Sequence, residues 1–537
     1  MSHIDWIILG FYIAGVVLMG ILIGRRQKDH EDYFLGSRRM KPWQVGLSIV
    51  ANQVSAISLI GAPAFVAMRD GGGLTWLQYE FAVPLAMIAI MIILVPVFFR
   101  QQGITIYEYL ERRFGTLTRS LLSLVFLVSR GLGAGVVLLA TSIVTSVCLE
   151  ISLTPTVLLI GGIALIYTSI GGIKADIYSD IVQLAILWTG AIVSLVIIVQ
   201  LLGSDALVFI STDRERLRVF NFAATGIGDN QSFSFWPMLI GGFFLYMSYY
   251  GCDQSQAQRL LTTATRDDAR KALFWNGLLR FPLVVTYCGL GLFLIPFLRD
   301  HPDFASKVQS TQADFLVPYF LVDYVPTGML GLIVAGIFAA SMSSIDSVLN
   351  SLSAVTWSDI VEKFVPRVTG LRDRSKIFWA RLITVGWGIV ATGFALLLAG
   401  GTDTVIELIN KIGSAFYGPV FAVFILGIFV RRATQSGAVI GLIAGTCTNI
   451  YLWLFCGSQV SWLWWNLIGF CVTFLIGSAM ALVSRSRLSV SDHTSESMAA
   501  IPKQAEGRHR YLVLGIAFLL MVILCLALER FLFAIIG

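Results

Sequence analysis

The sequence is poor in charged residues and in the side chains that usually bind metals or act as nucleophiles. Only 13% of its 537 residues are charged, and its five histidines (3, 30, 301, 493 and 509) fall in expected tails or loops. Its seven cysteines lie in apolar stretches with no CxxC spacing. This pattern argues against a disulfide framework, a thiolate or imidazole metal site and a histidine proton relay. We therefore expect that the protein is not an enzyme.

Long apolar stretches dominate the rest of the chain. Apolar residues make up 56% of it, and the mean hydropathy is +0.80, which is typical of an all-α polytopic membrane protein. The first stretch stops at Arg25 and Arg26 without a cleavage site, so we expect an anchor and not a signal peptide. We predict about fourteen transmembrane helices, over residues 4–24, 43–68, 74–99, 120–148, 155–173, 176–202, 235–252, 271–297, 327–350, 377–400, 406–430, 435–457, 461–484 and 511–535.

Basic residues are distributed unevenly between the loops that separate these spans. With the N-terminus outside, the expected cytoplasmic loops contain 27 Lys and Arg residues, and the opposite loops contain 6. The positive-inside rule therefore predicts that both termini are extracytoplasmic. Since the formal charge of +6 follows this topology, it predicts no nucleic-acid partner. The expected partner is the lipid of a plasma membrane, or of the inner membrane in a bacterium.

One apolar stretch, residues 331–353, becomes polar along one face. Ser343, Ser344 and Ser347 recur at helical spacing, and Asp346 follows Ser343 by three residues. A carboxylate inside a bilayer costs ~2.5–3.5 kcal/mol, so it usually faces a cavity, a partner or an ion. Hydroxyl and carboxylate oxygens suit a hard cation. The alternative is a serine-rich contact between helices, in which Asp346 bonds to a neighbour.

Two predicted spans, 43–68 and 235–252, carry interruptions. The first contains polar residues and then Gly61 and Pro63, where we expect the helix to break, and the second contains Gly241–Gly242 followed by tyrosines. The two spans are five helices apart, and an odd offset reverses the direction across the membrane. Interrupted helices at corresponding places in two halves predict a transporter site built from inverted repeats. Ordinary kinking at glycine and proline is the alternative.

Short motifs also occur in order at the ends of the predicted spans: Asp32–Arg38, Tyr107–Phe114, Gly171–Asp180, Asp253–Gln254, Gln258–Arg259, the serine-rich stretch and Leu426–Phe429. Together they resemble the sodium:solute symporters, a family of cotransporters for sugars, iodide, sialic acid, proline and vitamins. The resemblance implies sodium-coupled import of a small solute by alternating access. It also implies a LeuT-like core of five plus five helices, here residues 43–430. One helix precedes this core in 1–42, and three follow it in 431–537, with a polar cytoplasmic loop at 485–510.

The resemblance implies that sodium is the coupled ion. In this family one sodium ion lies between the first and eighth core helices. Its ligands, carried over to this sequence, are the carbonyls of Ala51, Val54 and Ala340 and the hydroxyls of Ser343 and Ser344. A helix broken in the membrane frees carbonyl groups for such a site.

Some members of the family hold a second sodium ion. The resemblance assigns it to Asp180, Ser343, Asp346 and Ser347. Asp346 departs from members that have a hydroxyl residue at this position. It is therefore open whether Asp346 strengthens a second ion site, carries a proton or makes a structural hydrogen bond.

Solute contacts are implied just before the break of the second span and on other core helices. Arg130 and Lys411 supply two cations and Glu80 one acid, which favours an anionic or zwitterionic solute. Organic acids, sialic acid-like sugars and carboxylate-bearing vitamins are the expected classes. The predicted solute-binding residues are Gln53, Ser55, Ser58, Glu80, Arg130, Tyr246 and Lys411, with Tyr246 also a candidate for an inner gate.

Each charged candidate also has a purely structural interpretation. Glu407 and Lys411 are spaced i,i+4 in the favourable order and could satisfy each other. Glu80 and Arg130 could form a bridge between helices. We expect Arg280, a few turns from the inner surface, to extend toward the headgroups.

Other functions remain open from the sequence. A proton-coupled carrier would use Asp346 or Asp180 as its proton site. A membrane solute sensor would need an external partner, because residues 485–510 are too few for a kinase domain. A channel is disfavoured, since paired broken helices suit occluded binding more than a continuous pore.

Overall fold

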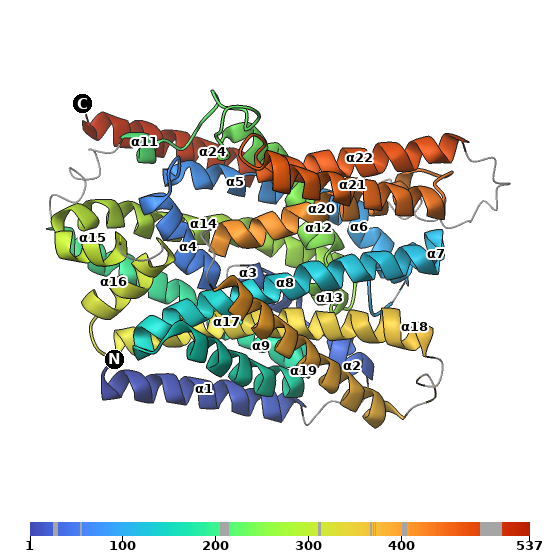
Figure 1. Cartoon of the computed structure of the whole chain (residues 1–537), viewed down its shortest axis with the longest axis horizontal. Coiled ribbons are helices and arrows are strands. Elements are labelled where there is room, and N and C mark those ends of the chain that lie inside the picture. The colour runs from blue at the N-terminus through green and yellow to red at the C-terminus, as the bar shows by residue number, and fades with distance from the viewer. Residues whose placement is uncertain are drawn as a thin grey trace.

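The part of the chain that the structure describes is built from apolar helices (Figure 1). In hydrocarbon each backbone N–H and C=O must be bonded within the chain, and a helix achieves this by itself. No strand occurs in the part of the chain that the structure describes. This computed structural model describes residues 1–24, 30–53, 56–101, 103–203, 214–309, 313–365, 368, 370, 372–399, 405–483 and 507–536.

The N-terminal half of the chain supplies a peripheral helix, a bent pair and two very long helices. Its elements are α1 (His3–Gly24), α2 (His30–Leu35), η1 (Gly36–Arg38), α3 (Pro42–Gln53), α4 (Ala56–Met68), η2 (Gly73–Trp76), α5 (Leu77–Glu80), α6 (Ala82–Gln101), α7 (Glu108–Phe114), α8 (Thr116–Leu149), α9 (Leu153–Leu202) and α11 (Arg214–Leu217).

The C-terminal half begins with helices separated by a break at Asp253 and ends with helices at the edge of the bundle. Its elements are η4 (Pro237–Gly241), α12 (Gly242–Cys252), α13 (Gln254–Leu261), α14 (Arg266–Asp300), α15 (Pro302–Gln309), η5 (Ala313–Phe315), α16 (Leu316–Tyr324), α17 (Met329–Val355), η6 (Thr356–Val361), α18 (Glu362–Phe364), α19 (Asp373–Leu398), α20 (Val405–Phe429), α21 (Gln435–Cys456), α22 (Trp462–Val483) and α24 (Arg508–Ile536).

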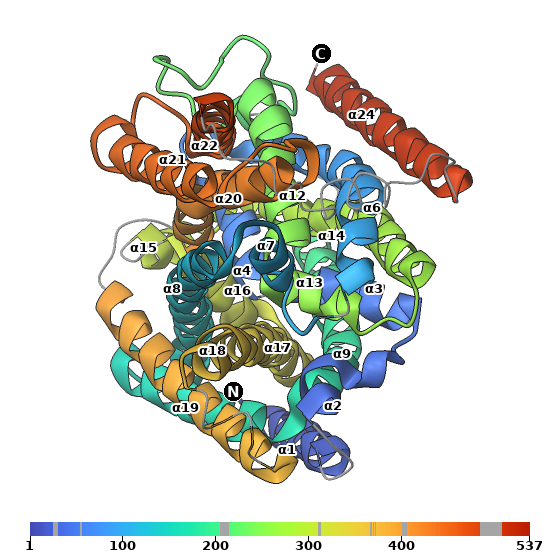
Figure 2. The ribbon, with the colours of Figure 1, turned by 90° about the vertical axis from the view of Figure 1, so that its right-hand side faces the viewer.

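The helices separate into an inner group and an outer group (Figure 2). In the most apolar window of α8, 83% of the residues are buried, and in α20 the share is 78%. The corresponding shares are 18% in α1 and 17% in α24. Since the exposed residues of these outer helices are apolar, their exposed faces suit lipid and not water.

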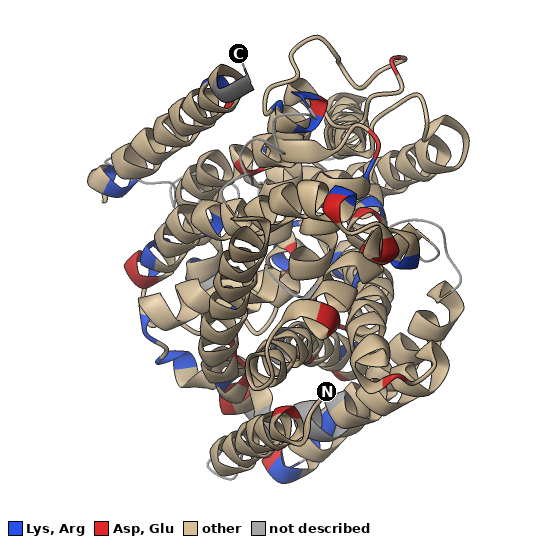
Figure 3. Cartoon of the chain, turned by 90° about the vertical axis from the view of Figure 1, so that its left-hand side faces the viewer, with Lys and Arg blue, Asp and Glu red and all other residues tan. Residues whose placement is uncertain are grey.

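The membrane-length helices only partly test the predicted number of spans. Ten described helices are long and apolar enough to cross a membrane, or eleven if the bent pair α3–α4 counts as one span. Charged residues are sparse along the helices in Figure 3. Both termini lie at the same end of the molecule, with α7 and α18 at the opposite end (Figure 1). The number fourteen remains a prediction.

The break in the second predicted span lies earlier than the sequence suggested. The axes of α3 and α4 meet at 51°, whereas α4 continues as a helix through Gly61 and Pro63. The expected break at these two residues is therefore wrong. Gly61 instead allows close packing, because a Cβ there would lie 2.9 Å from the Cβ of Ile406 on α20.

The other interrupted span breaks later than its glycine pair. Gly241 and Gly242 keep helical backbone angles at the junction of η4 and α12. The helix stops at Asp253, whose extended backbone (φ −91°, ψ 126°) separates α12 from α13. The Asp253 side chain accepts the backbone N–H of Ser255 and so caps α13. A polar capping residue, and not a glycine, makes this break.

Two aspartates fix the helices that carry the site. Asp5 of α1 accepts hydrogen bonds from the backbone N–H groups of Gly328 (2.7 Å) and Gly331 (2.8 Å) at the start of α17. Asp314 of η5 accepts the N–H of Val405 (3.0 Å) at the start of α20. Carboxylates at these N-termini satisfy otherwise unpaired donors. The ends of α17 and α20 are thereby held in place.

Gly291→Ala is expected to destabilise the packing of α14 on α4. A Cβ at Gly291 would lie 2.7 Å from both the Cα and the carbonyl oxygen of Pro63, and this backbone cannot rotate away. We expect a loss of ~1–3 kcal/mol, measured as a lower thermal midpoint of the detergent-purified protein. Gly289→Ala on the same helix is the control, because its Cβ would come no closer than 3.7 Å to Leu195. Equal midpoints for the two variants would contradict this packing.

Candidate functional site

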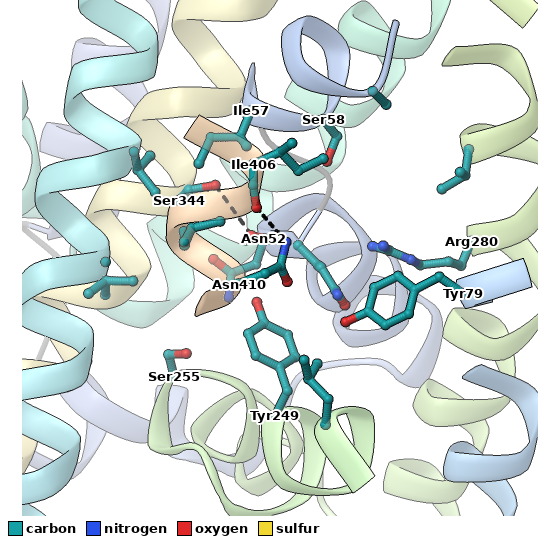
Figure 4. Close-up of a pocket in the computed structure, with 18 of the residues that line it drawn as sticks. Asn52, Ile57, Ser58, Tyr79, Tyr249, Ser255, Arg280, Ser344, Ile406 and Asn410 are labelled. Carbon is teal, nitrogen blue, oxygen red and sulfur yellow. Dashed lines mark hydrogen bonds between the residues drawn. The ribbon is translucent and has the colours of Figure 1, made fainter. Parts of the chain in front are cut away.

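A cavity lies at the centre of the inner helices, next to the break between α3 and α4 (Figure 4). Its wall is built from the last turn of α3, the first turns of α4, and η2, α5, α8, α12, α13, α14, α17 and α20. Pockets where several helices converge, with a few polar groups on an apolar wall, are typical binding sites. The polar and charged lining residues are Asn52, Gln53, Ser58, Trp76, Tyr79, Arg130, Tyr249, Ser255, Arg280, Tyr287, Ser344, Asn410 and Tyr417.

The serine-rich face of α17 meets the end of α3. The Ser344 hydroxyl donates to the carbonyl oxygen of Asn52 over 3.3 Å (Figure 4). Ala51, the residue before Asn52, is buried in the same turn. A helix that ends inside the bundle leaves its last carbonyls without helical partners. Carbonyl and hydroxyl oxygens therefore converge at this point, as a site for a hard cation requires.

Part of the predicted first ion site lies outside the described residues. Val54 and the predicted solute ligand Ser55 lie outside the described residues, between α3 and α4. Ala340 and Ser343 belong to α17, on the same helix as Ser344, but their side chains are outside the described part.

The predicted second ion site is organised around an arginine. Arg259 of α13 is 0% exposed, and its Nη2 lies 2.9 Å from Asp176 and 3.1 Å from Asp180. Ser347 donates to Asp176 (2.9 Å) and also contacts Arg259. Asp346, the residue before it, is buried and engaged by neighbours as well. The guanidinium thus already supplies positive charge to Asp180, a carboxylate that a second sodium ion would use.

Arg130 reaches the cavity from α8. Its guanidinium pairs with Asp253 and stacks on Tyr249, with 4.7 Å from Cζ to the ring centroid, and on Tyr417, with 5.7 Å. Aromatic faces and a carboxylate both stabilise a buried cation. The second terminal nitrogen, Nη2, is buried and has no hydrogen-bond partner among the described residues.

The alternative interpretation in which Glu80 pairs with Arg130 is wrong. Glu80 binds Arg280 of α14 through two contacts, Oε2 to Nε at 2.7 Å and Oε1 to Nη2 at 3.1 Å. The Tyr246 hydroxyl lies 3.4 Å from Glu80 Oε1. Glu80 and Tyr246 are therefore behind the cavity wall, whereas Arg280 forms part of it. The expectation that Arg280 extends toward the headgroups is also wrong, since only 6% of it is exposed.

Lys411 does not line the central cavity. It lies in a second pocket with Arg69, Glu407, Trp462 and Trp465. Glu407 forms an ion pair with Arg69 (2.6 Å). Asn410, the residue before Lys411, lines the central cavity instead. Its side-chain amide donates to the carbonyl oxygen of Ile406 (2.7 Å, Figure 4).

Three functional candidates were therefore missed from the sequence: Arg280, Arg259 and Asn410. The sequence shows that Arg280 is a charged residue within a predicted span, but it does not show that Glu80 faces Arg280. Arg259 belonged to a family motif without an assigned role. Lys411 was chosen over Asn410 because it is charged. Consecutive residues of a helix point about 100° apart, so only one of the two faces the cavity.

Comparison with known proteins identifies the fold and family. Residues 33–445 match the Sodium:solute symporter family. The chain belongs to this family. The predicted LeuT-like all-α fold is confirmed, because the symporter aligns with the substrate-bound outward-open structure of a Na⁺-coupled sialic acid symporter at a TM-score of 0.80. This alignment has 24% identity and covers 90% of this chain and 98% of the other. The predicted coupling of solute transport to sodium is confirmed as well.

The symporter also resembles proteins whose solutes are named. It is 29% identical over 505 residues to the sodium/sialic acid symporter NanT of Aliivibrio fischeri, covering 94% of this chain and 97% of that one. It is 30% identical over 467 residues to human sodium-coupled monocarboxylate transporter 1 (85% and 74%). It is 29% identical over 472 residues to the rabbit sodium-dependent multivitamin transporter (86% and 71%).

Arg259→Met is expected to destabilise the symporter strongly. The change leaves Asp176 and Asp180 buried together without their common cation, and breaking a buried ion pair costs ~3–5 kcal/mol. The thermal midpoint of the purified protein should fall well below that of the wild type. Arg266→Met, at an exposed position at the start of α14, should leave the midpoint nearly unchanged. Equal thermal midpoints for the two variants would show that Arg259 does not stabilise Asp176 and Asp180.

Proposed function

We propose that this symporter imports an organic solute that bears a carboxylate, either anionic or zwitterionic. The observation that carries the proposal is the central cavity, whose wall includes both Arg130 and the place where Ser344 meets the carbonyl end of α3. Arginine binds carboxylates with strong charge-assisted hydrogen bonds. Sialic acid and monocarboxylates, named for two of the relatives, share that group.

The proposed sodium site joins α3 to α17. Its ligands are the carbonyls of Ala51, Val54 and Ala340 and the hydroxyls of Ser343 and Ser344. The contact between Ser344 and Asn52 supports it, because it brings the two elements within reach of one ion. Each sodium ion that enters down a ~100 mV potential contributes about 2.3 kcal/mol to solute accumulation.

A second sodium ion would be held by Asp180, Ser343, Asp346 and Ser347. This proposal has a structural condition. Arg259 contacts both Asp180 and Ser347, so a second ion could use these oxygens only after the guanidinium has turned away.

The proposed solute ligands divide by position. Gln53, Ser58 and Arg130 line the cavity and would touch the solute. Glu80 and Tyr246 would act from behind, and Lys411 would meet the solute in the second pocket. Ser55 is also proposed to contact the solute, because it directly precedes α4 in the sequence.

The wider organisation is likewise a proposal. We infer that residues 43–430 form the inverted-repeat core, that 1–42 and 431–537 are additions to it, and that both termini face outward from a plasma membrane. The position of both termini at one end of the molecule supports their facing the same side of the membrane (Figure 1). The outward direction rests on the distribution of Lys and Arg among the loops.

Ser344→Ala is expected to weaken sodium coupling. Loss of one hydroxyl ligand should raise the sodium concentration for half-maximal uptake roughly tenfold, the equivalent of one neutral ligand contact. The assay is uptake into proteoliposomes of N-acetylneuraminate, lactate and biotin, with and without an inward sodium gradient.

Ser341→Ala is the matched control for this test. Ser341 is also buried on α17, but its hydroxyl bonds to Ile337 within its own helix. Its sodium dependence should equal that of the wild type. A full sodium response in Ser344→Ala would remove the proposed ion site, and uptake that follows pH while ignoring sodium would favour the proton-coupled alternative.

A further inference from the structure

A second guanidinium approaches the cavity from the side opposite α8. Arg280 projects from α14 toward the middle of the cavity, next to Tyr79, while α8, which carries Arg130, lies across from it (Figure 4). The two arginines come from different helices and are each 6% exposed. The cavity is therefore bounded by positive charge on two sides.

Glu80 fixes the orientation of Arg280 but uses only part of it. The carboxylate binds Nε and Nη2, which form one edge of the planar guanidinium. The remaining nitrogen, Nη1, is buried and has no hydrogen-bond partner among the described residues. An unmet N–H of a charged group is costly in a buried site. A bound acceptor would remove this cost.

Other polar atoms on the cavity wall share this condition. Gln53 Oε1, Tyr287 OH and Arg130 Nη2 are also buried without partners in the described structure. Among the described lining residues there is no carboxylate, because Asp253 and Glu80 stand behind their arginines. The wall consequently offers guanidinium N–H donors from two sides and no acidic group.

We propose that Arg280 is a specificity-determining residue that donates through Nη1 to a second oxygen-rich group of the solute. The preferred solute then carries a carboxylate at one end, bound by Arg130, and another anionic or polyhydroxyl group at the other end, bound by Arg280. Simple aliphatic monocarboxylates lack this second group. The inference rests on the proposed function and narrows its solute class.

The test compares solutes with one or two acceptor ends in the full-length protein. Uptake and its competition by N-acetylneuraminate, succinate and butyrate are measured in proteoliposomes with a sodium gradient. The wild type should prefer N-acetylneuraminate or succinate to butyrate. Arg280→Lys and the double change Glu80→Gln with Arg280→Gln should reduce that preference roughly tenfold or more.

The ratio of apparent affinities separates recognition from folding. A lower yield of active protein lowers the maximal uptake of every solute. It does not change the ratio of the apparent affinities for two solutes. The double variant also avoids leaving Glu80 buried without a cation. Arg270→Gln is the control, since Arg270 is a buried arginine of the same helix that does not line the cavity. This variant should keep the wild-type ratio.

Two results would overturn the inference while leaving the proposed function standing. One is an unchanged ratio in both Arg280 variants. The other is a wild-type protein that takes up butyrate as well as the two-ended acids, which would leave the proposed carboxylate transport intact. A wild-type protein that takes up none of these acids would contradict the proposed function and, with it, this assignment of Arg280.

Discussion

The need to pair charges inside an apolar bundle organises this symporter. Two buried ion pairs, Arg130 with Asp253 and Arg280 with Glu80, hold arginines of the cavity wall. Arg259 makes a third buried ion pair with Asp176 and Asp180. Each pair joins a helix from residues 43–202 to one from residues 235–430. Unpaired charges at these depths would be expensive, so each pair constrains how the two groups of helices lie against each other. Any movement between the groups must carry these pairs along or exchange their partners.

The same pairing shapes the chemistry of the cavity. Each carboxylate sits behind its arginine and orients it, which leaves one nitrogen of Arg130 and one of Arg280 without a hydrogen-bond partner among the residues that the structure describes. Electrostatic attraction is stronger where water is excluded. The cavity therefore offers oriented donors although the ion pairs themselves are neutral overall. The end of α3 supplies a complementary acceptor, because the carbonyl oxygen of Asn52 faces the hydroxyl of Ser344 there.

The sequence predicted the location of the site better than its contacts. The serine face of residues 331–353 and the polar end of the second span pointed to the place where Ser344 now meets Asn52. The second cation of the cavity was assigned to Lys411, but it is Arg280. Lys411 and Asn410 are neighbours on one helix, and only the direction in which α20 faces its neighbours decides which of them lines the cavity. The depth of a residue in the membrane follows from its position along the helix. The residue that it contacts on another helix does not.

By itself the sequence determined that the chain is a helical membrane protein of the sodium:solute symporter family, because apolar length and motif order are properties of the chain alone. It also showed that two spans are interrupted. The tertiary structure decided where they break, placing the second break at Asp253 and moving the first away from Gly61 and Pro63. It likewise decided which carboxylate faces which arginine. These are outcomes of packing between segments more than a hundred residues apart or in different helices, and no local pattern encodes them.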